Sequence, residues 1–324
     1  MTNVSLRPEY ARPRTPRRAD AKKFSDPCWT AKGDPRAAVE AAAFTALWFN
    51  TGTLCNLACQ GCYIESSPRN DRLSYLNRSD VRQFLNEAGR EHQGIEDIGF
   101  TGGEPFMNPD IIGMIADALA AGYQALVLTN AMSPMRRHRL ALCALNARYP
   151  GKLSLRVSLD HFTPEGHERI RGPRAWKPAI DGLKWLSDCG FAVTVAARLL
   201  DGDEAQLRRG FAGLFARHGI EIDADDPGRL ILFPEMDISA DVPEISDHCW
   251  ALLGKRPSDL MCATARMVIK RKGDSRPVVV SCTLLPYDDP FEMGRTLAEA
   301  KRPVRLNHPH CAKFCVLGGA SCNQ

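Results

Sequence analysis

Three cysteines stand close together in the run Asn50 to Tyr63, which reads NTGTLCNLACQGCY. Cys55, Cys59 and Cys62 form a C-x3-C-x2-C spacing directly after an apolar segment, which suits a loop at the end of a strand. Three thiolates satisfy three irons of a [4Fe–4S] cluster and leave the fourth iron open. Because an open coordination position is where a metal centre does chemistry, the spacing predicts a reactive iron–sulfur site.

Two simpler interpretations of these cysteines are open at this point. A disulfide with one spare thiol is disfavoured if the protein is intracellular, where thiols stay reduced. A zinc site of three cysteines is possible, but it normally takes a fourth ligand, and no histidine lies nearby in the sequence.

Length and composition limit the classes of protein to which this chain can belong. The chain has 324 residues, enough for a substantial core and a smaller second unit. It has no apolar run of membrane-spanning length, and no apolar segment follows its basic start, so we expect a cytoplasmic protein without a membrane partner. In that compartment, 12 cysteines indicate metal or redox centres.

The basic charge is concentrated at the start of the chain. Residues 1–23 carry seven Lys or Arg against two acidic residues, while the whole chain has a net charge of only +4. We interpret residues 1–43 as a basic, Pro-rich N-terminal arm. Such a tail is more often solvated than bound to nucleic acid, so a nucleic-acid partner is disfavoured.

The middle of the chain alternates between strand and helix patterns. Apolar runs rich in β-branched and aromatic residues predict six strands, over 43–49, 95–100, 125–130, 152–159, 192–200 and 229–233. Amphipathic stretches that start at Ser, Asp or Asn or stop at Gly predict the helices between them, over 79–92, 108–122, 133–149, 175–190 and 203–219. This alternation predicts an α/β fold of repeated right-handed βαβ units around a parallel sheet. An open doubly wound sheet and a partial barrel fit the pattern equally.

Polar residues follow five of these strands. After the cysteine loop come groups at the ends of the second to fifth strands, where parallel α/β folds place their chemistry. These groups are Gly102, Gly103 and Glu104; Asn130; Ser158 and Asp160; and Arg198. Turn and capping residues with no common function would not be expected to gather at the carboxyl ends of the same strands, so we expect a shared site there.

The cysteine run and the tripeptide Gly102-Gly103-Glu104 resemble two motifs of the radical S-adenosylmethionine (SAM) enzymes. The resemblance covers most of 44–234 and implies a partial (β/α)6 TIM-like barrel, whose first [4Fe–4S] cluster binds SAM at its open iron. It also implies contacts with SAM: Tyr63 against the adenine, Gly102, Gly103 and Glu104 near the ammonium, Ser158 and Asp160 at the ribose, and Asn130 and Arg198 near the carboxylate and ribose. The roles of His161, His167 and Arg171 in the following loop are left open.

The last part of the chain carries a second set of cysteines. Cys262 and Cys282 flank a turn sequence at equal distance, so closing a hairpin brings both thiols to its open end. Further on come Cys311, Cys315 and Cys322, and a zinc ribbon would explain the pairs as well on chemistry alone.

The arrangement resembles the SPASM/twitch extensions of radical SAM enzymes, which implies a unit over 237–324 with one auxiliary [4Fe–4S] cluster. We assign it to Cys262, Cys282, Cys311 and Cys315, with Cys322 as the alternative fourth ligand or a free thiol. His308 and His310 are possible substitutes. Cys143 and Cys189, in apolar helical patterns, are predicted to be buried and inert.

The resemblance implies the chemistry as well. The reduced cluster splits SAM into methionine and a 5′-deoxyadenosyl radical, which abstracts hydrogen from a small-molecule or peptide substrate. The auxiliary cluster suggests net oxidation, a dehydrogenation or a cross-link, with a donor such as flavodoxin or ferredoxin. The alternatives are a redox-neutral isomerase or lyase whose auxiliary cluster is structural, and a non-enzymatic iron–sulfur or zinc-binding regulatory protein.

Overall fold

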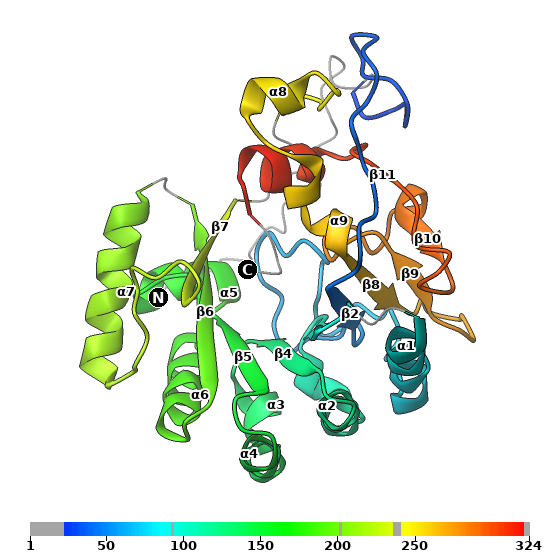
Figure 1. Ribbon diagram of the computed structural model, residues 1–324. Helices are drawn as coiled ribbons and strands as arrows, with labels where there is room; N and C mark the ends of the chain where they lie inside the picture. The colour runs from blue at the N-terminus through cyan, green and yellow to red at the C-terminus, as the bar shows by residue number, and fades with distance from the viewer. Residues whose placement is uncertain (1–22, 92–93, 201–202, 236–240, 321–324) are drawn as a thin grey trace, which may run out of the picture.

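The computed structural model describes residues 23–91, 94–200, 203–235 and 241–320 of the chain. Most of the predicted basic arm, residues 1–22, and Cys322 lie outside the described residues. The core of the described part is a nine-stranded sheet of order β10-β9-β8-β2-β3-β4-β5-β6-β7 (Figure 1). Its strands are Ala46–Asn50 (β2), Asp97–Thr101 (β3), Gln124–Thr129 (β4), Leu153–Ser158 (β5), Ala192–Leu199 (β6), Leu230–Pro234 (β7), Ala265–Ile269 (β8), Val278–Val280 (β9) and Glu292–Gly294 (β10).

All six predicted strands are present, as β2 to β7, and neighbouring strands pair in parallel. The structure is the partial TIM-like barrel that the resemblance implied. One strand was not foreseen as part of the barrel: β8 pairs in parallel with β2, from Ala46↔Ala265 to Phe49↔Val268. The sheet of the barrel therefore continues into the C-terminal unit.

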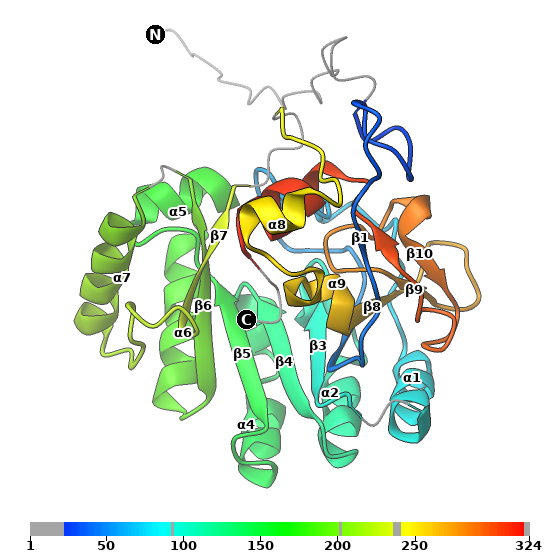
Figure 2. The same ribbon diagram turned by 45° about the horizontal axis from the view of Figure 1, so that its top comes forward.

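The predicted helices connect the strands and cover the outside of the curved sheet. Figures 1 and 2 show α1, α2, α4, α6 and α7 ranged around this outer side. The helices of the barrel are Arg78–Glu91 (α1), Ile111–Ala120 (α2), Ser133–Arg136 (α3), Arg139–Arg148 (α4), Pro164–Arg171 (α5), Trp176–Asp188 (α6) and Glu204–His218 (α7), with a 3-10 turn at Pro105–Met107. The predicted helix over 133–149 is two helices, since α3 ends after one turn.

Local sequence explains where several helices begin and end. The side chain of Asp203 accepts a hydrogen bond from the backbone N–H of Gln206 at the start of α7, and Gly219 ends this helix in the left-handed conformation. Thr163 caps α5 in the same way through Gly166. These caps fix the point at which the chain turns back from the rim of the barrel.

Apolar side chains fill the space between sheet and helices. The ring of Phe49 on β2 stacks on Phe100 of β3 at 5.8 Å and meets Phe84 of α1 edge-on at 6.4 Å. On β3, a Cβ at Gly99 would lie 2.3 Å from the ring of Trp48, its cross-strand neighbour on β2. The large Trp48 ring therefore needs a glycine beside it.

The C-terminal unit lies beside β2 and over the carboxyl ends of the barrel strands. The predicted hairpin is confirmed: β8 and β9 pair antiparallel, from Met267↔Val280 to Ile269↔Val278. Figure 2 shows α8 and the red C-terminal helix above the barrel. The remaining elements are Ala38–Val39 (β1), Cys249–Leu253 (α8), Met261–Thr264 (α9), Val304–Arg305 (β11), two 3-10 turns at Pro257–Asp259 and Asp289–Phe291, and a π-helix over Cys311–Leu317.

The segment before the barrel is tied to this unit. β1 pairs antiparallel with β11. The buried guanidinium of Arg36 forms an ion pair of 2.5 Å with Glu244, whose side chain is also nearly inaccessible. Breaking such a pair would leave a buried charge without compensation, so the pair holds residues 23–43, the described part of the predicted arm, firmly against the C-terminal unit.

Candidate active site and metal centres

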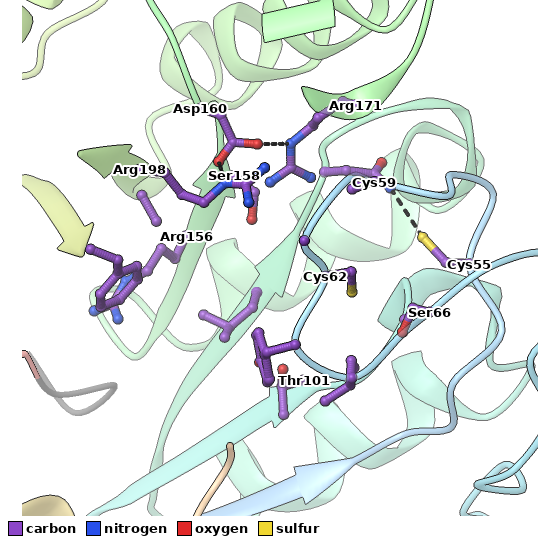
Figure 3. Close-up of a pocket in the computed structure, with 18 of the residues that line it drawn as sticks. Cys55, Cys59, Cys62, Ser66, Thr101, Arg156, Ser158, Asp160, Arg171 and Arg198 are labelled. Carbon is purple, nitrogen blue, oxygen red and sulfur yellow. Dashed lines mark hydrogen bonds and ion pairs between the residues drawn. The ribbon is translucent and has the colours of Figure 1, made fainter. Parts of the chain in front are cut away.

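A cavity of about 200 Å³ lies where the carboxyl ends of β2 to β6 meet (Figure 3). It brings together residues that are far apart in the chain, from Cys55 to Phe314. Of the predicted rim residues, ten line it: Cys55, Cys59, Cys62, Tyr63, Gly102, Gly103, Asn130, Ser158, Asp160 and Arg198. Only tertiary folding into a parallel barrel brings these side chains to one mouth.

The cysteine loop is held in shape by its own backbone and by the barrel. The backbone N–H of Cys62 donates to the carbonyl of Cys59 at 3.3 Å, and Gln60 donates to the carbonyl of Ile170 in α5 at 2.8 Å. The thiol of Cys55 accepts from the N–H of Leu57 at 3.4 Å. The three thiols thus stand on one short, anchored loop that faces the cavity.

The thiols fit the binding of a cluster. Burial raises the pKa of Cys55 to about 12 and also raises that of Cys59, against which the charge of Arg171 acts. Without metal these groups are therefore protonated, and metal binding must release their protons. In the described part of the chain, no three His, Cys, Asp or Glu side chains converge on the position of a single metal ion. In a cluster each thiolate binds a different iron, so this convergence is not required.

The two glycines of the second motif brace the cysteine loop. A Cβ at Gly103 would lie 2.2 Å from the carbonyl oxygen of Leu54, and one at Gly102 would lie 2.5 Å from that of Gly52. Gly103 N–H donates to the Gly52 carbonyl at 2.8 Å. Both glycines also line the cavity. The close approach of backbone to backbone is possible only without side chains.

The carboxylate of Glu104 is buried and hydrogen-bonded to residues at the ends of β3 and β4. It is 2% exposed and is not among the described residues that line the cavity. It accepts hydrogen bonds from the Thr129 hydroxyl at 2.8 Å, the Asn130 N–H at 2.8 Å and the Phe106 N–H at 3.3 Å. Burial raises its pKa to about 7, although these bonds act in the opposite direction. Its carboxylate joins β3 to β4, and its contact with the SAM ammonium stays a prediction.

Asn130 connects this carboxylate to the cysteine loop. Its side-chain Nδ2 donates to Asn56 Oδ1 at 2.9 Å and lies 4.0 Å from the sulfur of Cys55. Its Oδ1 accepts from the N–H of Met132 at 3.1 Å. The amide therefore sets the position of the loop, and both of its donor hydrogens face the loop.

Charged residues form a second wall of the cavity. Asp160 accepts from Arg171 Nε at 2.7 Å and lies 3.5 Å from Arg198 Nε (Figure 3). Burial acts to raise the pKa of Asp160, but the two guanidinium groups hold it below its usual value. Arg198 also donates to the carbonyl of Gln60 at 2.9 Å. These ion pairs join α5 and β6 to the cysteine loop.

His161, which precedes α5, and His167, which lies within it, do not belong to the described cavity lining. His161 Nδ1 accepts from the N–H of Thr163 at the start of α5. His167 has no exposed surface, meets Trp176 edge-on at 5.7 Å, and has no hydrogen-bond partner for either ring nitrogen among the described residues. Burial lowers its pKa to about 4, and the charge of Arg171 acts in the same direction.

The sequence patterns missed several residues that line the cavity. Arg156 lies inside an otherwise apolar strand segment. Its charge, at a position where an apolar residue is expected, was the feature that could have identified it as a cavity residue. Leu284 and Phe314 come from the C-terminal unit, and no local pattern connects them with the barrel. The unpredicted lining residues also include Gln60, Ser66, Thr101 and Phe233, whereas Arg171, whose role the sequence left open, does line the cavity.

A second group of cysteines lines a small apolar pocket of about 20 Å³ in the C-terminal unit. Cys262 lies in α9, Cys282 follows β9, and Cys311 and Cys315 lie in the π-helix. Burial raises the pKa of Cys262 to about 12 and that of Cys311 well above its usual value. Four thiols around an apolar pocket are a donor set that fits a fully ligated cluster.

Two details of this pocket bear on the predicted ligands. His308 and His310 are not among its described lining residues, and burial lowers the pKa of each to about 4. Leu284 and Phe314 line both this pocket and the first cavity. These two side chains therefore lie between the cavity and the apolar pocket.

The prediction that Cys143 and Cys189 are buried is wrong, because both are exposed. In α4 the neighbouring Leu142 faces the core, so Cys143, one position further along the helix, points to solvent. Cys189 is the C-terminal cap of α6. Apolar content predicted the helices correctly but did not identify which face each thiol occupies.

Residues 49–205 match the family model of the Radical SAM superfamily. The subtilosin biosynthesis protein AlbA of Bacillus subtilis is 31% identical over 45% of this chain and 31% of its own length. The mycofactocin maturase MftC of Mycobacterium tuberculosis is 29% identical over 51% of this chain and 40% of its own length. This chain thus spans less than half the length of these two relatives.

Among solved structures, anSMEcpe with bound AdoMet (SAM) and a Cp18Cys peptide is similar in fold. Its TM-score is 0.55 at 13% identity, over 79% of each chain. In the described part of this chain, no helix is both long and apolar enough to cross a membrane.

Proposed function

This chain belongs to the radical SAM superfamily, and we propose that it cleaves SAM to start radical chemistry on a peptide. The observation that carries this proposal is the cavity into which three cysteines of one loop, two glycines and the Asp160 ion pairs converge. Its cofactors are a [4Fe–4S] cluster and SAM, with an auxiliary cluster as in SPASM-type relatives.

Cys55, Cys59 and Cys62 would hold the first cluster through three of its irons. Together with SAM, this cluster would supply a 5′-deoxyadenosyl radical for hydrogen abstraction from the substrate. The chain's own part is to bind and to orient. Gly102 and Gly103 keep the loop backbone in position, and Asp160, held ionised by two guanidinium groups, offers acceptors for hydroxyl groups.

Two findings favour a peptide over a small molecule as the substrate. AlbA is a biosynthesis protein of the bacteriocin subtilosin, and anSMEcpe is seen with a peptide bound. The C-terminal unit contributes Leu284 and Phe314 to the cavity, which gives an extended substrate apolar surface to lie against.

The auxiliary cluster would be held by Cys262, Cys282, Cys311 and Cys315, with Cys322 as the alternative fourth ligand. A cluster with four thiolates has no open iron, so its task is to move electrons. The two shared side chains, Leu284 and Phe314, support a short path from the cavity to this pocket. We therefore favour net oxidation of the peptide, with electrons for SAM cleavage from a donor such as flavodoxin or ferredoxin.

Anaerobic reconstitution with iron and sulfide, followed by product analysis, tests this function. Wild-type protein should hold about eight irons, as two [4Fe–4S] clusters require, and should release 5′-deoxyadenosine from SAM. The triple variant C55A/C59A/C62A should lose this release. The double variant C143A/C189A, which removes exposed thiols outside both described pockets, is the matched control and should keep it.

Three outcomes would overturn parts of the proposal. Zinc in place of iron at the loop cysteines would exclude SAM cleavage and favour a regulatory metal protein. A product at the oxidation level of its substrate would favour the redox-neutral alternative. An intact rate after the auxiliary cluster alone is disrupted would make that cluster structural.

A further inference from the structure

Arg156 stands in the middle of β5 and faces the interior of the barrel. Its cross-strand neighbours are Leu128 on β4 and Thr194 on β6. The side chain is 5% exposed, yet it lines the same cavity as the three loop cysteines. Its Nε donates to the Thr194 hydroxyl at 3.3 Å, which orients the guanidinium along the wall formed by β5 and β6. A charged side chain therefore occupies a strand position that faces the cavity.

The charges that line the cavity are unevenly distributed. Its described lining contains three guanidinium groups, from Arg156, Arg171 and Arg198, and one carboxylate, from Asp160. Asp160 stands between Arg171 and Arg198 at the rim. An oxidised [4Fe–4S] core held by three thiolates would carry a net charge of about −1, which is smaller than the excess of guanidinium groups over carboxylates. The described lining therefore carries an excess of positive charge, and a low-dielectric wall strengthens its potential.

Arg156 lies away from the part of the cavity where the cluster would bind. It precedes Ser158 by two residues, which is about 7 Å along a strand toward the interior of the barrel. Figure 3 shows it on the side of the cavity opposite Cys55. The rim guanidinium groups, in contrast, touch Asp160 and the cysteine loop. The two positive regions of the cavity are therefore distinct.

We propose that Arg156 binds a carboxylate of the peptide substrate and so fixes which part of the peptide faces the loop cysteines. The inference rests on the proposed function and specifies a carboxylate as the group of the peptide that the cavity recognises. A guanidinium matches a carboxylate with two parallel hydrogen bonds, and the buried position strengthens them. Leu128, Leu284 and Phe233 supply apolar walls for the neighbouring parts of the peptide. The carboxylate can belong to an Asp or Glu side chain or to the peptide C-terminus.

Peptide pools with matched charges test this proposal on the reconstituted full-length chain in the presence of SAM. One pool of eight-residue peptides has a central Asp or Glu and an amidated C-terminus. A second has Asn or Gln at that position, and a third is neutral with a free C-terminus. Equilibrium dialysis followed by mass spectrometry measures how much of each pool is retained. The first and third pools distinguish the side-chain from the terminal carboxylate.

Wild-type protein should retain one of the carboxylate pools about 30-fold better than the amide pool, as expected when one partner of a buried charge pair is lost. R156Q should lose this preference, and R156K should keep part of it through its charge. R209Q, which removes an exposed charge on α7, should behave as wild type. Equal retention of all three pools by the wild-type protein would overturn the proposal, and this comparison does not depend on the folding of any variant.

A second measurement separates substrate binding from SAM binding. If Arg156 held the carboxylate of SAM, R156Q would erase the preference of the protein for SAM over decarboxylated SAM, and the proposal would be wrong. We expect that preference to remain. Release of 5′-deoxyadenosine by the wild-type protein distinguishes a failure of the proposed function from a failure of the role of Arg156. If no 5′-deoxyadenosine is released, the proposed function is wrong. If it is released but no carboxylate pool is preferred, only the role of Arg156 is wrong.

Discussion

The two cysteine groups of this chain differ in how they are built and in what surrounds them. The loop group stands on eight consecutive positions, from Cys55 to Cys62, and opens on a charged cavity of about 200 Å³. The C-terminal group is assembled from α9, the end of β9 and the π-helix around an apolar pocket of about 20 Å³. Three thiols beside a polar cavity suit a cluster that must bind a ligand, and four thiols in an apolar pocket suit one that exchanges only electrons.

Removing one thiol from each group should separate the two roles most strongly. Cys59→Ala should abolish release of 5′-deoxyadenosine, because the first cluster loses one of only three ligands. Cys282→Ala should leave that release in place while product formation falls. Chromatography of 5′-deoxyadenosine and of the peptide product measures both. Equal loss of both activities in the two variants would contradict the division of roles.

The close packing of Gly102 and Gly103 against the cysteine loop, called the glycine brace, should affect iron binding only by the loop cysteines. In Gly103→Ala the new Cβ would meet the Leu54 carbonyl oxygen at 2.2 Å, so the loop must shift. We expect a loss of about 1–3 kcal/mol in unfolding free energy, typical of overpacking, and a fall from about eight to about four irons. Gly89→Ala in α1 is the control, since its Cβ would have only an ordinary contact of 3.6 Å with the Tyr123 hydroxyl. Full iron content in Gly103→Ala would show that the brace is dispensable.

Both regions should share one sensitivity to acid. Burial lowers the pKa of His167, His308 and His310 from 6.5 to about 4. The unfolded chain therefore takes up these protons first, and stability falls as the pH drops from 6.5 toward 4. His167→Phe should reduce this loss by about 2 kcal/mol between pH 7 and pH 5. Urea unfolding at both pH values measures the effect, with His218→Phe at the end of α7 as control, and an unchanged pH dependence would contradict it.

The smallest expected effect concerns the polar surroundings of the first cluster. Asn130 Nδ2 lies 4.0 Å from the Cys55 sulfur, and an N–H near a thiolate stabilises the reduced, more negative cluster. Asn130→Leu should lower the midpoint potential by roughly 40 mV, which corresponds to a hydrogen bond of about 1 kcal/mol. A redox titration followed by electron paramagnetic resonance, without SAM or substrate, measures this shift. Asn146→Leu on the outer helix α4 should leave the potential unchanged.

Much of the barrel could be predicted because each of its signals is local. Alternating apolar runs and helix caps identified all six strands and most of the helices between them, but α5 was interpreted as a loop and the helix over 133–149 is two helices. The rim residues were also found, because parallel βαβ units bring the ends of all strands to one edge. What failed depended on contacts between distant segments. β8 joins the sheet beside β2, and Leu284 and Phe314 of the C-terminal unit line the cavity of the barrel.

The sequence by itself determined the chemistry that is available: a three-cysteine loop after a strand, a glycine pair one strand later, and a Cys-bounded hairpin near the end. These features are short-range, since spacing and backbone preference specify them. Three features depended on the tertiary structure: Arg156 faces the cavity, Leu284 and Phe314 line both pockets, and Cys143 and Cys189 are exposed. The reason is physical: which face of a strand or helix is buried depends on what packs against it, and those partners are far away in the chain.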